Sequence, residues 1–267
     1  MTERESTPWI LLRGLGRDTR HWGDLPLRLR EAFPLAPVMP VDLAGNGSRH
    51  GEKSPHTIAA ATDDYRAHLR ACGLHPPYRL LGLSMGGMVA VDWLNRHPDE
   101  VLQALAINIS VGRISSPWLR LRPSALLSLL VWGGWTLAAR EHWVRRFTTQ
   151  LQSDPDNLER HWVALARQAH PRPGNLLRQL YAAACFRSRR PATARRLYLL
   201  VSARDRLVNP NASRQLARRW RLTLAEHPDA GHDLPLDDPQ WLIDRLLDAS
   251  PIASTSLRRK NPGNGGT

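Results

Sequence analysis

The sequence predicts an α/β fold in which helices cover both faces of a doubly wound, mainly parallel sheet of about six strands. Short apolar runs alternate with longer segments of helical character, and this alternation is typical of parallel strands joined by helices. A chain of 267 residues with 42% hydrophobic residues can bury such a core. The predicted strands are 9–12, 38–41, 78–83, 101–109, 196–201 and 222–226.

Helix-like segments separate these runs, at about 19–33, 57–72, 86–96, 211–220 and 238–248. Three of them follow a side chain that can accept a hydrogen bond from the free amides of a first helical turn. The expected N-caps are Thr57, Asn211 and Asp238, and Pro239 after the last of them suits the first turn of a helix.

The alternation stops between Ser110 and Pro191, over a stretch of about 80 residues that is far too long for one connection between a strand and a helix. It contains helix-like pieces and no convincing strand. We therefore expect a helical cap at 112–190 inserted into an α/β core at 1–111 and 191–250. A tail at 251–267, rich in Ser, Pro, Gly and Asn, is expected to be disordered.

Residues 125–139 of the insertion are conspicuously apolar and include Trp132 and Trp135. This segment is shorter than the ~20 residues that a membrane span needs. We expect it to pack its apolar side on the rest of the protein. The alternative is an exposed lid that makes peripheral contact with lipid or a hydrophobic substrate, so Trp132 and Trp135 are candidate substrate-binding residues.

The net charge of +13 comes almost entirely from arginines spread along the whole chain. No recognition helix, zinc finger or RNP-type motif organises them, so we predict no specific nucleic-acid partner. Solvated surface charge is the favoured interpretation. A basic face that attracts an anionic substrate or lipid headgroups is the alternative.

The two cysteines, Cys72 and Cys185, have no metal-ligand spacing and are too few for a disulfide framework. Neither a metal nor a disulfide is expected. The polar start of the chain is not typical of a secretory signal, so a cytoplasmic location is expected. The oligomeric state is left open.

Ser84 lies in the pattern Gly-x-Ser-x-Gly at residues 82–86, directly after an apolar run and directly before a helix-like segment. This is the layout of a nucleophile elbow, in which a strained turn holds the serine hydroxyl clear of the backbone. The glycines are needed because other chain segments pass close to such a turn. The alternative is a glycine-rich turn with a spectator serine.

A serine nucleophile needs a general base and a carboxylate that fixes the tautomer of that base. Asp205 and His232 each follow a predicted strand, and the carboxyl ends of parallel strands meet at one edge of the sheet. His21 is the competing base, but it precedes Ser84 and breaks the expected order of Ser, acid and His. The alternative carboxylates lie in the loop of His232 itself: Asp229, Asp233 and Asp237.

Two backbone amides are expected to form the oxyanion hole. One is the N–H of Met85, directly after the nucleophile, and the other is the N–H of Leu15, in the loop after the first strand. Each such donor can stabilise the developing negative charge by roughly 2.7–4 kcal/mol.

These motifs, in this order, resemble those of the α/β-hydrolase-fold superfamily, in its serine hydrolase branch with a helical cap. Residues 14–16 resemble the family's HG-x-G oxyanion loop, 41–48 its D-x-P-G-x-G-x-S loop and 82–86 its elbow. Asp205 and Gly231-His232 resemble its acid and base motifs. The resemblance covers about residues 9 to 248, and the insertion takes the position of the family's cap.

The sequence departs from the family pattern where the loop histidine is replaced by Arg13, and where a proline and a second histidine are replaced by Ala44 and Asn46. Arg13 is expected to place a cation near the substrate entrance and is a candidate substrate-binding residue. Asp42 is expected to be structural.

The resemblance implies a cofactor-free serine hydrolase that forms an acyl-enzyme. A serine at the elbow disfavours the dehalogenase and epoxide-hydrolase branches, which use an aspartate. We expect the substrate to be a carboxylic ester of a small hydrophobic or acyl compound. Thioester, lactone or carbon–carbon bond hydrolysis on the same triad is the alternative, as is a non-catalytic ligand-binding homologue.

Overall fold

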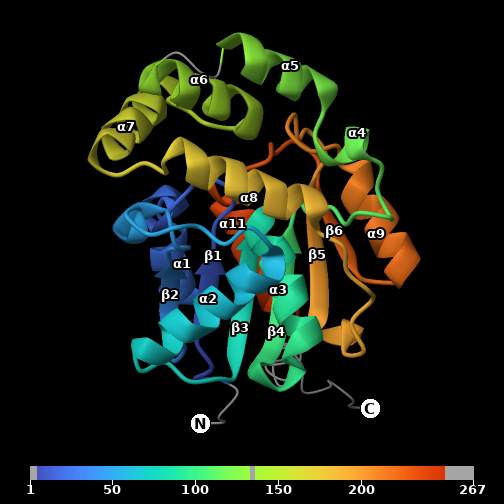
Figure 1. Ribbon diagram of the computed structural model, residues 1–267. Coiled ribbons are helices and arrows are strands. Elements are labelled where there is room, and N and C mark those ends of the chain that lie inside the picture. Colours follow the sequence, from blue (N-terminus) through green and yellow to red (C-terminus); the bar gives the residue numbers. More distant parts are fainter. Residues whose placement is uncertain (1–4, 133–135, 250–267) are drawn as a thin grey trace, which may run out of the picture.

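The computed structural model describes residues 5–132 and 136–249 and is built on a single parallel sheet (Figure 1). The strand order is β2-β1-β3-β4-β5-β6, and each neighbouring pair is parallel. The predicted fold class, a doubly wound parallel sheet of six strands, is confirmed. The strands are β1 (Trp9–Leu12), β2 (Val38–Val41), β3 (Tyr78–Leu83), β4 (Val101–Ile107), β5 (Leu197–Ser202) and β6 (Leu224–His227).

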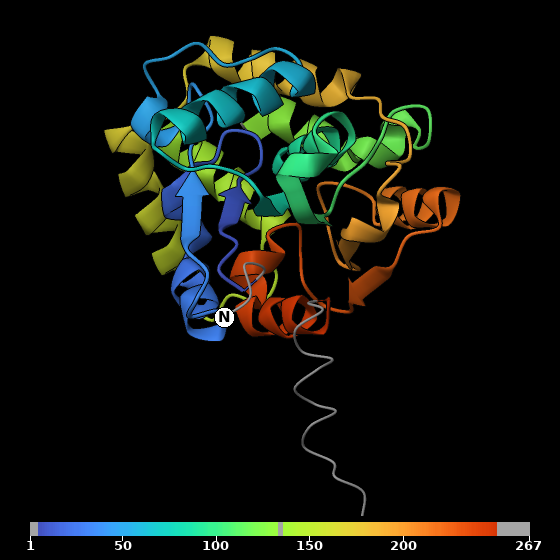
Figure 2. The same cartoon turned by 90° about the horizontal axis from the view of Figure 1, so that it is seen from below.

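Helices cover both faces of this sheet, which Figure 2 shows from below. One face packs against α2 (Ile58–Ala71), α3 (Met85–Arg96) and α9 (Asn211–Trp220). The other packs against α1 (Leu25–Ala32) and α11 (Pro239–Ala249). All four residues of β1 are buried, because alternate side chains of a strand point to opposite faces and both faces are covered.

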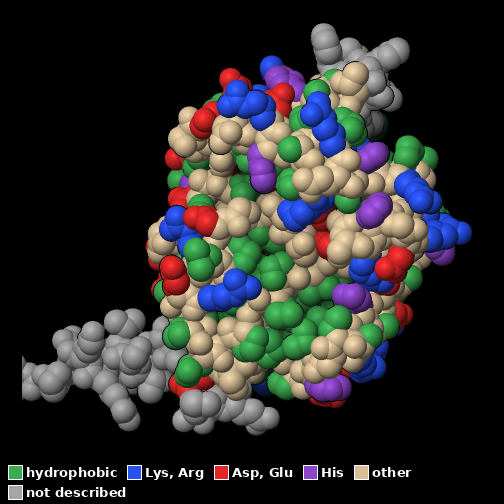
Figure 3. All heavy atoms as spheres, turned by 90° about the vertical axis from the view of Figure 1, so that its left-hand side faces the viewer, with side chains coloured by type: hydrophobic (Ala, Val, Ile, Leu, Met, Phe, Trp, Pro, Cys, Tyr) green, Lys and Arg blue, Asp and Glu red, His purple; other side chains and the backbone are tan. Residues whose placement is uncertain are grey.

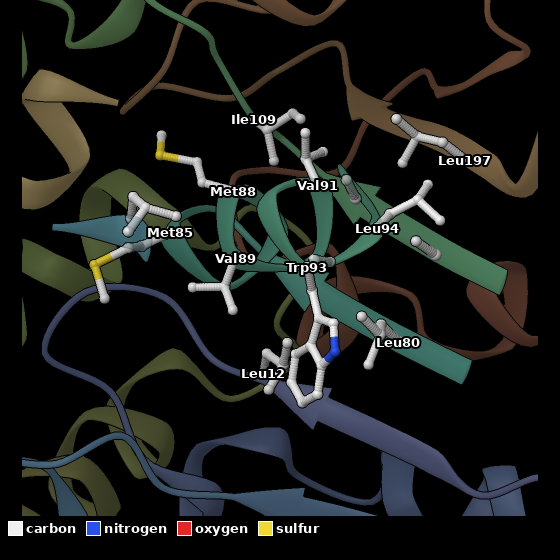
Figure 4. Close-up of a cluster of buried hydrophobic side chains, with 14 of the residues drawn as sticks. Leu12, Leu80, Met85, Met88, Val89, Val91, Trp93, Leu94, Ile109 and Leu197 are labelled. Carbon is white, nitrogen blue, oxygen red and sulfur yellow. The ribbon is translucent and has the colours of Figure 1, made fainter. Parts of the chain in front are cut away.

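Helix α3 packs closely against the strands that precede the elbow. Its side chains form one cluster with Leu12 of β1 and Leu80 of β3 (Figure 4). A Cβ added to Gly86 would lie 2.0 Å from the carbonyl oxygen of Leu12, and one added to Gly82 would lie 2.3 Å from the carbonyl oxygen of Gly86. The glycines of the motif therefore permit the close approach of helix and strand that the sequence predicts.

Three local predictions can be compared with the structure. The helix expected at 19–33 is instead a 3-10 turn, Thr19–Trp22, followed by α1, because the chain turns at Gly23 with a φ of 59°. Thr57 and Asp238 cap their helices as predicted. Asn211 as an N-cap was wrong: it is the first residue of α9, and its amide donates to the side chain of Asn209.

The described residues of the stretch 112–190 contain helices and no strand. They are α4 (Pro117–Arg120), α5 (Pro123–Trp132), α6 (Leu137–Thr148), α7 (Pro155–Gln168) and α8 (Pro173–Cys185). In Figure 1 α5, α6 and α7 lie above the rest of the chain and α8 crosses below them. None of the helices described in the structure has the length and apolar character to cross a membrane.

Two predictions fall on parts of the chain outside the described residues. Trp132 ends α5, but its side chain is not among the described ones, and Trp135 lies in the gap at 133–135. The tail predicted to be disordered, 251–267, also lies outside the described residues.

Many surface arginines pair with carboxylates. Examples are Arg28 with Asp24, Arg66 with Glu100 and Arg96 with Asp63. On the side of the molecule shown in Figure 3, basic and acidic side chains are interspersed. This arrangement fits the interpretation of the net charge as solvated surface charge.

Gly86→Ala should destabilise the protein, because the new methyl group meets the backbone of β1, which cannot move aside without breaking the sheet. We expect the free energy of unfolding, measured by urea denaturation, to fall by about 3 kcal/mol, the upper part of the range for overpacked sites. Gly51→Ala is the control, since a Cβ there has no atom within 4 Å. Equal midpoints for the two variants would contradict the close packing of α3 on β1.

Candidate active site

Ser84 lies in a strained turn between β3 and α3. Its backbone has φ 56° and ψ −117°, in a region that residues other than glycine rarely adopt, and its amide donates to the carbonyl of Ile107 at 2.8 Å. The loop after β1 passes beside it, since a Cβ added to Gly14 would lie 3.3 Å from the Ser84 Cβ. The serine is therefore presented next to the loop predicted to supply an oxyanion donor.

The structure brings Asp205 and His232 together. His232 Nδ1 and Asp205 Oδ2 are 2.6 Å apart, and the two side chains are only 5% and 1% exposed. The other carboxylate oxygen of Asp205 accepts the amides of Leu207 and Val208, at 2.8 and 2.9 Å. The carboxylate is thus held in one orientation, and with Nδ1 engaged the Nε2 atom of His232 remains for proton transfer.

Ser84 Oγ and His232 Nε2 are not hydrogen-bonded to each other in the structure. A bond between nucleophile and base often tightens only when substrate binds. The two residues nevertheless belong to neighbouring parts of the sheet edge, because Asn108, which follows β4 beside Ser84, donates to the carbonyl oxygen of His232 at 2.8 Å.

Asn108 was not predicted from the sequence. It adopts a φ of 52°. Its side-chain amide also bonds twice to Ser202 at the end of β5: the NH2 group donates to the Ser202 hydroxyl, and the carbonyl oxygen accepts from the Ser202 backbone N–H. The signal that could have identified it is a polar residue directly after a buried strand, of a type that tolerates positive φ. Its contacts join β4, β5 and the base loop, residues 231–233.

The three alternative carboxylates have other partners. Asp237 accepts the amides of Gly231 at 2.7 Å and of Gln150 at 2.9 and 3.0 Å, and burial raises the pKa of its carboxyl group. Asp233 pairs with Arg13, and Asp229 pairs with Arg204 at the surface. None of the three is hydrogen-bonded to His232, so Asp205 is its carboxylate partner.

The two amides predicted for the oxyanion hole are available. Met85 is the first residue of α3, so its N–H lies outside the hydrogen-bond ladder of the helix. In the loop after β1, the Gly16 amide donates to Gln179 of α8 at 2.8 Å and the Arg17 amide to Gly14 at 3.3 Å. The Leu15 amide has no partner among the described residues and remains the predicted second donor.

His21, the competing base, is committed to other contacts. Its Nδ1 lies 3.0 Å from a carboxylate oxygen of Asp18, and its Nε2 lies 3.1 Å from Arg17 Nη1, which can only donate. Burial, together with the nearby Arg17 charge, lowers the pKa of His21. A ring whose second nitrogen already accepts a hydrogen bond from an arginine is poorly suited to take a proton from Ser84.

Arg13, predicted to place a cation near the substrate entrance, is buried in the structure. The residue is 3% exposed, and its guanidinium pairs with Asp233. Its role in substrate binding stays a prediction. Asp42 is structural as expected, because it accepts the amides of Thr19 and Ser48 at 2.8 and 2.9 Å. Within the described residues no group of histidines, cysteines or carboxylates is arranged to hold a metal, and both cysteines are free.

Comparisons with known proteins agree with this architecture. A family model described as "Alpha/beta hydrolase family" matches residues 9–245. Among solved structures, a hydrolase from Pseudomonas aeruginosa superposes with a TM-score of 0.72 at 17% identity, covering 93% of this chain and 91% of the other. The enol-lactonase of Burkholderia xenovorans superposes with a TM-score of 0.68 at 20% identity, covering 93% of each chain.

Two sequence relatives are similar over part of their length. A pimeloyl-(acyl-carrier protein) methyl ester esterase of Neisseria meningitidis is 35% identical over 43% of this chain and 42% of its own. The biotin biosynthesis bifunctional protein BioHC of Cellvibrio japonicus is 27% identical over 94% of this chain and 49% of its own. The match thus spans less than half the length of either relative.

Asp205→Asn preserves the shape of the carboxylate but removes its charge and favours the wrong tautomer of His232. We expect the rate at which a fluorophosphonate labels Ser84 to fall by about 10⁴-fold, as in triads generally. Asp229→Asn, in the neighbouring surface pair, is the matched control and should label at the normal rate. If both variants react alike, Asp205 is not the partner of the base.

Proposed function

The chain belongs to the alpha/beta hydrolase family, and we propose that within it this enzyme cleaves a carboxylic ester through an acyl-enzyme on Ser84. The observation that carries the proposal is the buried 2.6 Å contact between His232 and Asp205, at the same sheet edge as the strained turn of Ser84. A histidine oriented in this way is what a weakly acidic serine hydroxyl needs in order to attack at neutral pH.

In the first half of the proposed reaction, His232 Nε2 takes the proton of the Ser84 hydroxyl while Oγ attacks the ester carbonyl carbon. The negative charge that develops on the carbonyl oxygen is stabilised by the N–H groups of Leu15 and Met85. The tetrahedral intermediate then collapses. The C–O bond to the alcohol breaks, and His232 returns the proton to the departing alcohol oxygen.

In the second half, water attacks the acyl-enzyme. His232 removes a proton from the water, the same two amides stabilise the second tetrahedral intermediate, and the bond to Ser84 Oγ breaks. The proton passes back to Ser84, and a carboxylic acid is released. Asp205 remains ionised throughout and stabilises the imidazolium form of His232 in each half of the reaction.

For the substrate, we propose a methyl or other small-alcohol ester of an acyl chain held on an acidic carrier. The name of the Neisseria relative, a methyl ester esterase acting on a carrier-bound acyl group, supports this class. An open pocket of about 380 Å³ at the end of α6 supports an anionic component, because Arg145, Arg146 and Arg206 line it. Arg146 and Arg206 have no carboxylate partner among the described residues.

This pocket lies beside the catalytic loops. Arg206 directly follows Asp205. Gln150, which also lines the pocket, donates its backbone amide to Asp237, and Asp237 also accepts the amide of Gly231 in the base loop. An anionic carrier bound there would bring its acyl chain to the same end of the sheet as Ser84. Hydrolysis of a thioester, a lactone or a carbon–carbon bond would use the same triad and is distinguished by the leaving group.

Labelling with a fluorophosphonate tests the proposed nucleophile. The wild-type protein should be labelled, Ser84→Ala should not, and Ser110→Ala, which removes another buried serine beyond β4, should be labelled normally. Wild-type protein that has not been treated with the fluorophosphonate is then assayed on matched oxygen esters and thioesters of increasing chain length. Labelling that survives in Ser84→Ala would exclude Ser84, and a faster thioester in every pair would favour the thioesterase alternative.

Reversing the charge of the pocket tests the anionic carrier. For a methyl ester on acyl carrier protein, Arg146→Glu with Arg206→Glu should raise KM at least about tenfold, equivalent to about 1.4 kcal/mol, and weaken the salt dependence of kcat/KM. The free methyl ester should be hydrolysed unchanged. Arg219→Glu, at an exposed arginine of α9, is the control. Equal KM values for all three proteins would exclude this pocket.

A further inference from the structure

Arg13 directly precedes the oxyanion loop, residues 14–16, yet its side chain ends on the base loop. Its Nη1 and Nη2 donate to the two carboxylate oxygens of Asp233, at 3.0 and 2.6 Å. The side chains are 2% and 4% exposed. The guanidinium also lies 4.7 Å from the ring centre of Trp22. The ion pair is therefore bidentate, buried and supported by an aromatic face.

Burial limits what this pair adds to stability. Removing two charges from water costs roughly as much as their attraction returns, so a buried pair is a weak explanation for stability alone. A bidentate pair does fix geometry, because two parallel hydrogen bonds tolerate little displacement. Arg13 directly follows the last residue of β1, and Asp233 directly follows His232 in the sequence. Their pairing thus sets the spacing between the oxyanion loop and the base.

The other backbone hydrogen bonds of the base loop do not run directly to the oxyanion loop. Asn108 donates to the carbonyl of His232 from the end of β4, and Asp237 accepts the Gly231 amide from within α10 (Leu234–Asp237). The carbonyl of Thr148, in α6, accepts the Asp233 amide at 2.7 Å. None of the three partners belongs to the oxyanion loop or its flanks. Among the described residues, Arg13 makes the hydrogen-bonded link between the two loops.

We propose that Arg13 is a positioning residue for the reaction at Ser84. Through Asp233 it keeps the imidazole of His232 in line with the serine hydroxyl while the oxyanion amides face the same carbonyl group. This inference rests on the proposed serine chemistry. An imidazole at position 13 could not donate two parallel hydrogen bonds to one carboxylate, so this form of alignment depends on the guanidinium.

The test compares Arg13→Met, Arg13→Lys and Asp233→Asn with the wild type in hydrolysis of a short-chain aryl ester. Rates are expressed per active serine, titrated with a fluorophosphonate. We expect kcat of Arg13→Met to fall by about 10²-fold, the cost of a small misplacement of a catalytic group, with KM nearly unchanged. Arg13→Lys keeps the positive charge but cannot donate two parallel hydrogen bonds to the carboxylate. Its kcat should lie between those of the wild type and Arg13→Met. Combining Arg13→Met with Asp233→Asn should be no worse than either alone.

Arg66→Met is the matched control. Arg66 also makes a bidentate pair, with Glu100 at 2.8 and 2.7 Å, but it lies on α2 away from the catalytic loops. This variant should lower the melting temperature and leave kcat unchanged. The effects of substitutions at independent sites scatter by about twofold in such a rate. If Arg13→Met and Asp233→Asn also keep kcat within about twofold of the wild type, Arg13 is only structural and the proposal is wrong.

The outcomes separate this inference from the proposed function. A wild type that is labelled on Ser84 and active, together with unaffected Arg13 variants, overturns the positioning role alone. A wild type that is neither labelled nor active on any ester overturns both. If Arg13→Met does not fold, Arg13→Lys and Asp233→Asn decide, because both retain polar groups that can occupy the site.

Discussion

The base loop, residues 231–233, has to hold one histidine in a fixed place without the support of a helix or strand. Buried backbone groups in such a loop need hydrogen-bond partners from elsewhere. The amide of Gly231 donates to Asp237, the carbonyl of His232 accepts from Asn108, and the amide of Asp233 donates to the carbonyl of Thr148. These partners come from three separate parts of the chain. The hydrogen bonds that satisfy the buried backbone groups of the loop therefore also fix the position of His232. The geometry of the candidate site depends on this loop.

The same requirement joins the helical insertion to the core. The carbonyl that accepts from Asp233 belongs to α6, and α6 also provides Glu141, which is buried against Arg17 of the loop after β1. From α8, Gln179 accepts the amide of Gly16. Separating these helices from the site would leave buried polar groups without partners, at roughly 1–3 kcal/mol for each. The insertion is therefore fixed to both loops of the candidate site. Because α6 lines the proposed substrate pocket, the same contacts also hold one wall of that pocket in place.

The sequence predicts well those features that depend on residues close together in the chain, and it predicts poorly the contacts between residues far apart. The strands and the turn at Ser84 are encoded by neighbouring residues, and the pairing of Asp205 with His232 follows because each lies just beyond a strand. The pairing of Arg13 with Asp233 joins residues 220 positions apart, and each residue alone resembles an ordinary loop charge. Local sequence gives no information about such a contact. The helix predicted at 19–33 failed for a different reason: its apolar spacing is helical, but the positive φ at Gly23 interrupts it.

The arginines show why composition and function are only loosely related in this chain. A guanidinium is planar and weakly hydrated, so it can be buried against a carboxylate and an aromatic ring, as Arg13 and Arg17 are. Such residues count toward the net charge of +13 but offer little attraction to a ligand, because a carboxylate already neutralises each of them. Exposed arginines that pair on the surface are neutralised in the same way. For the anionic carrier that we propose, the relevant charge is therefore that of Arg146 and Arg206, which have no carboxylate partner among the described residues, and not the sum over the chain.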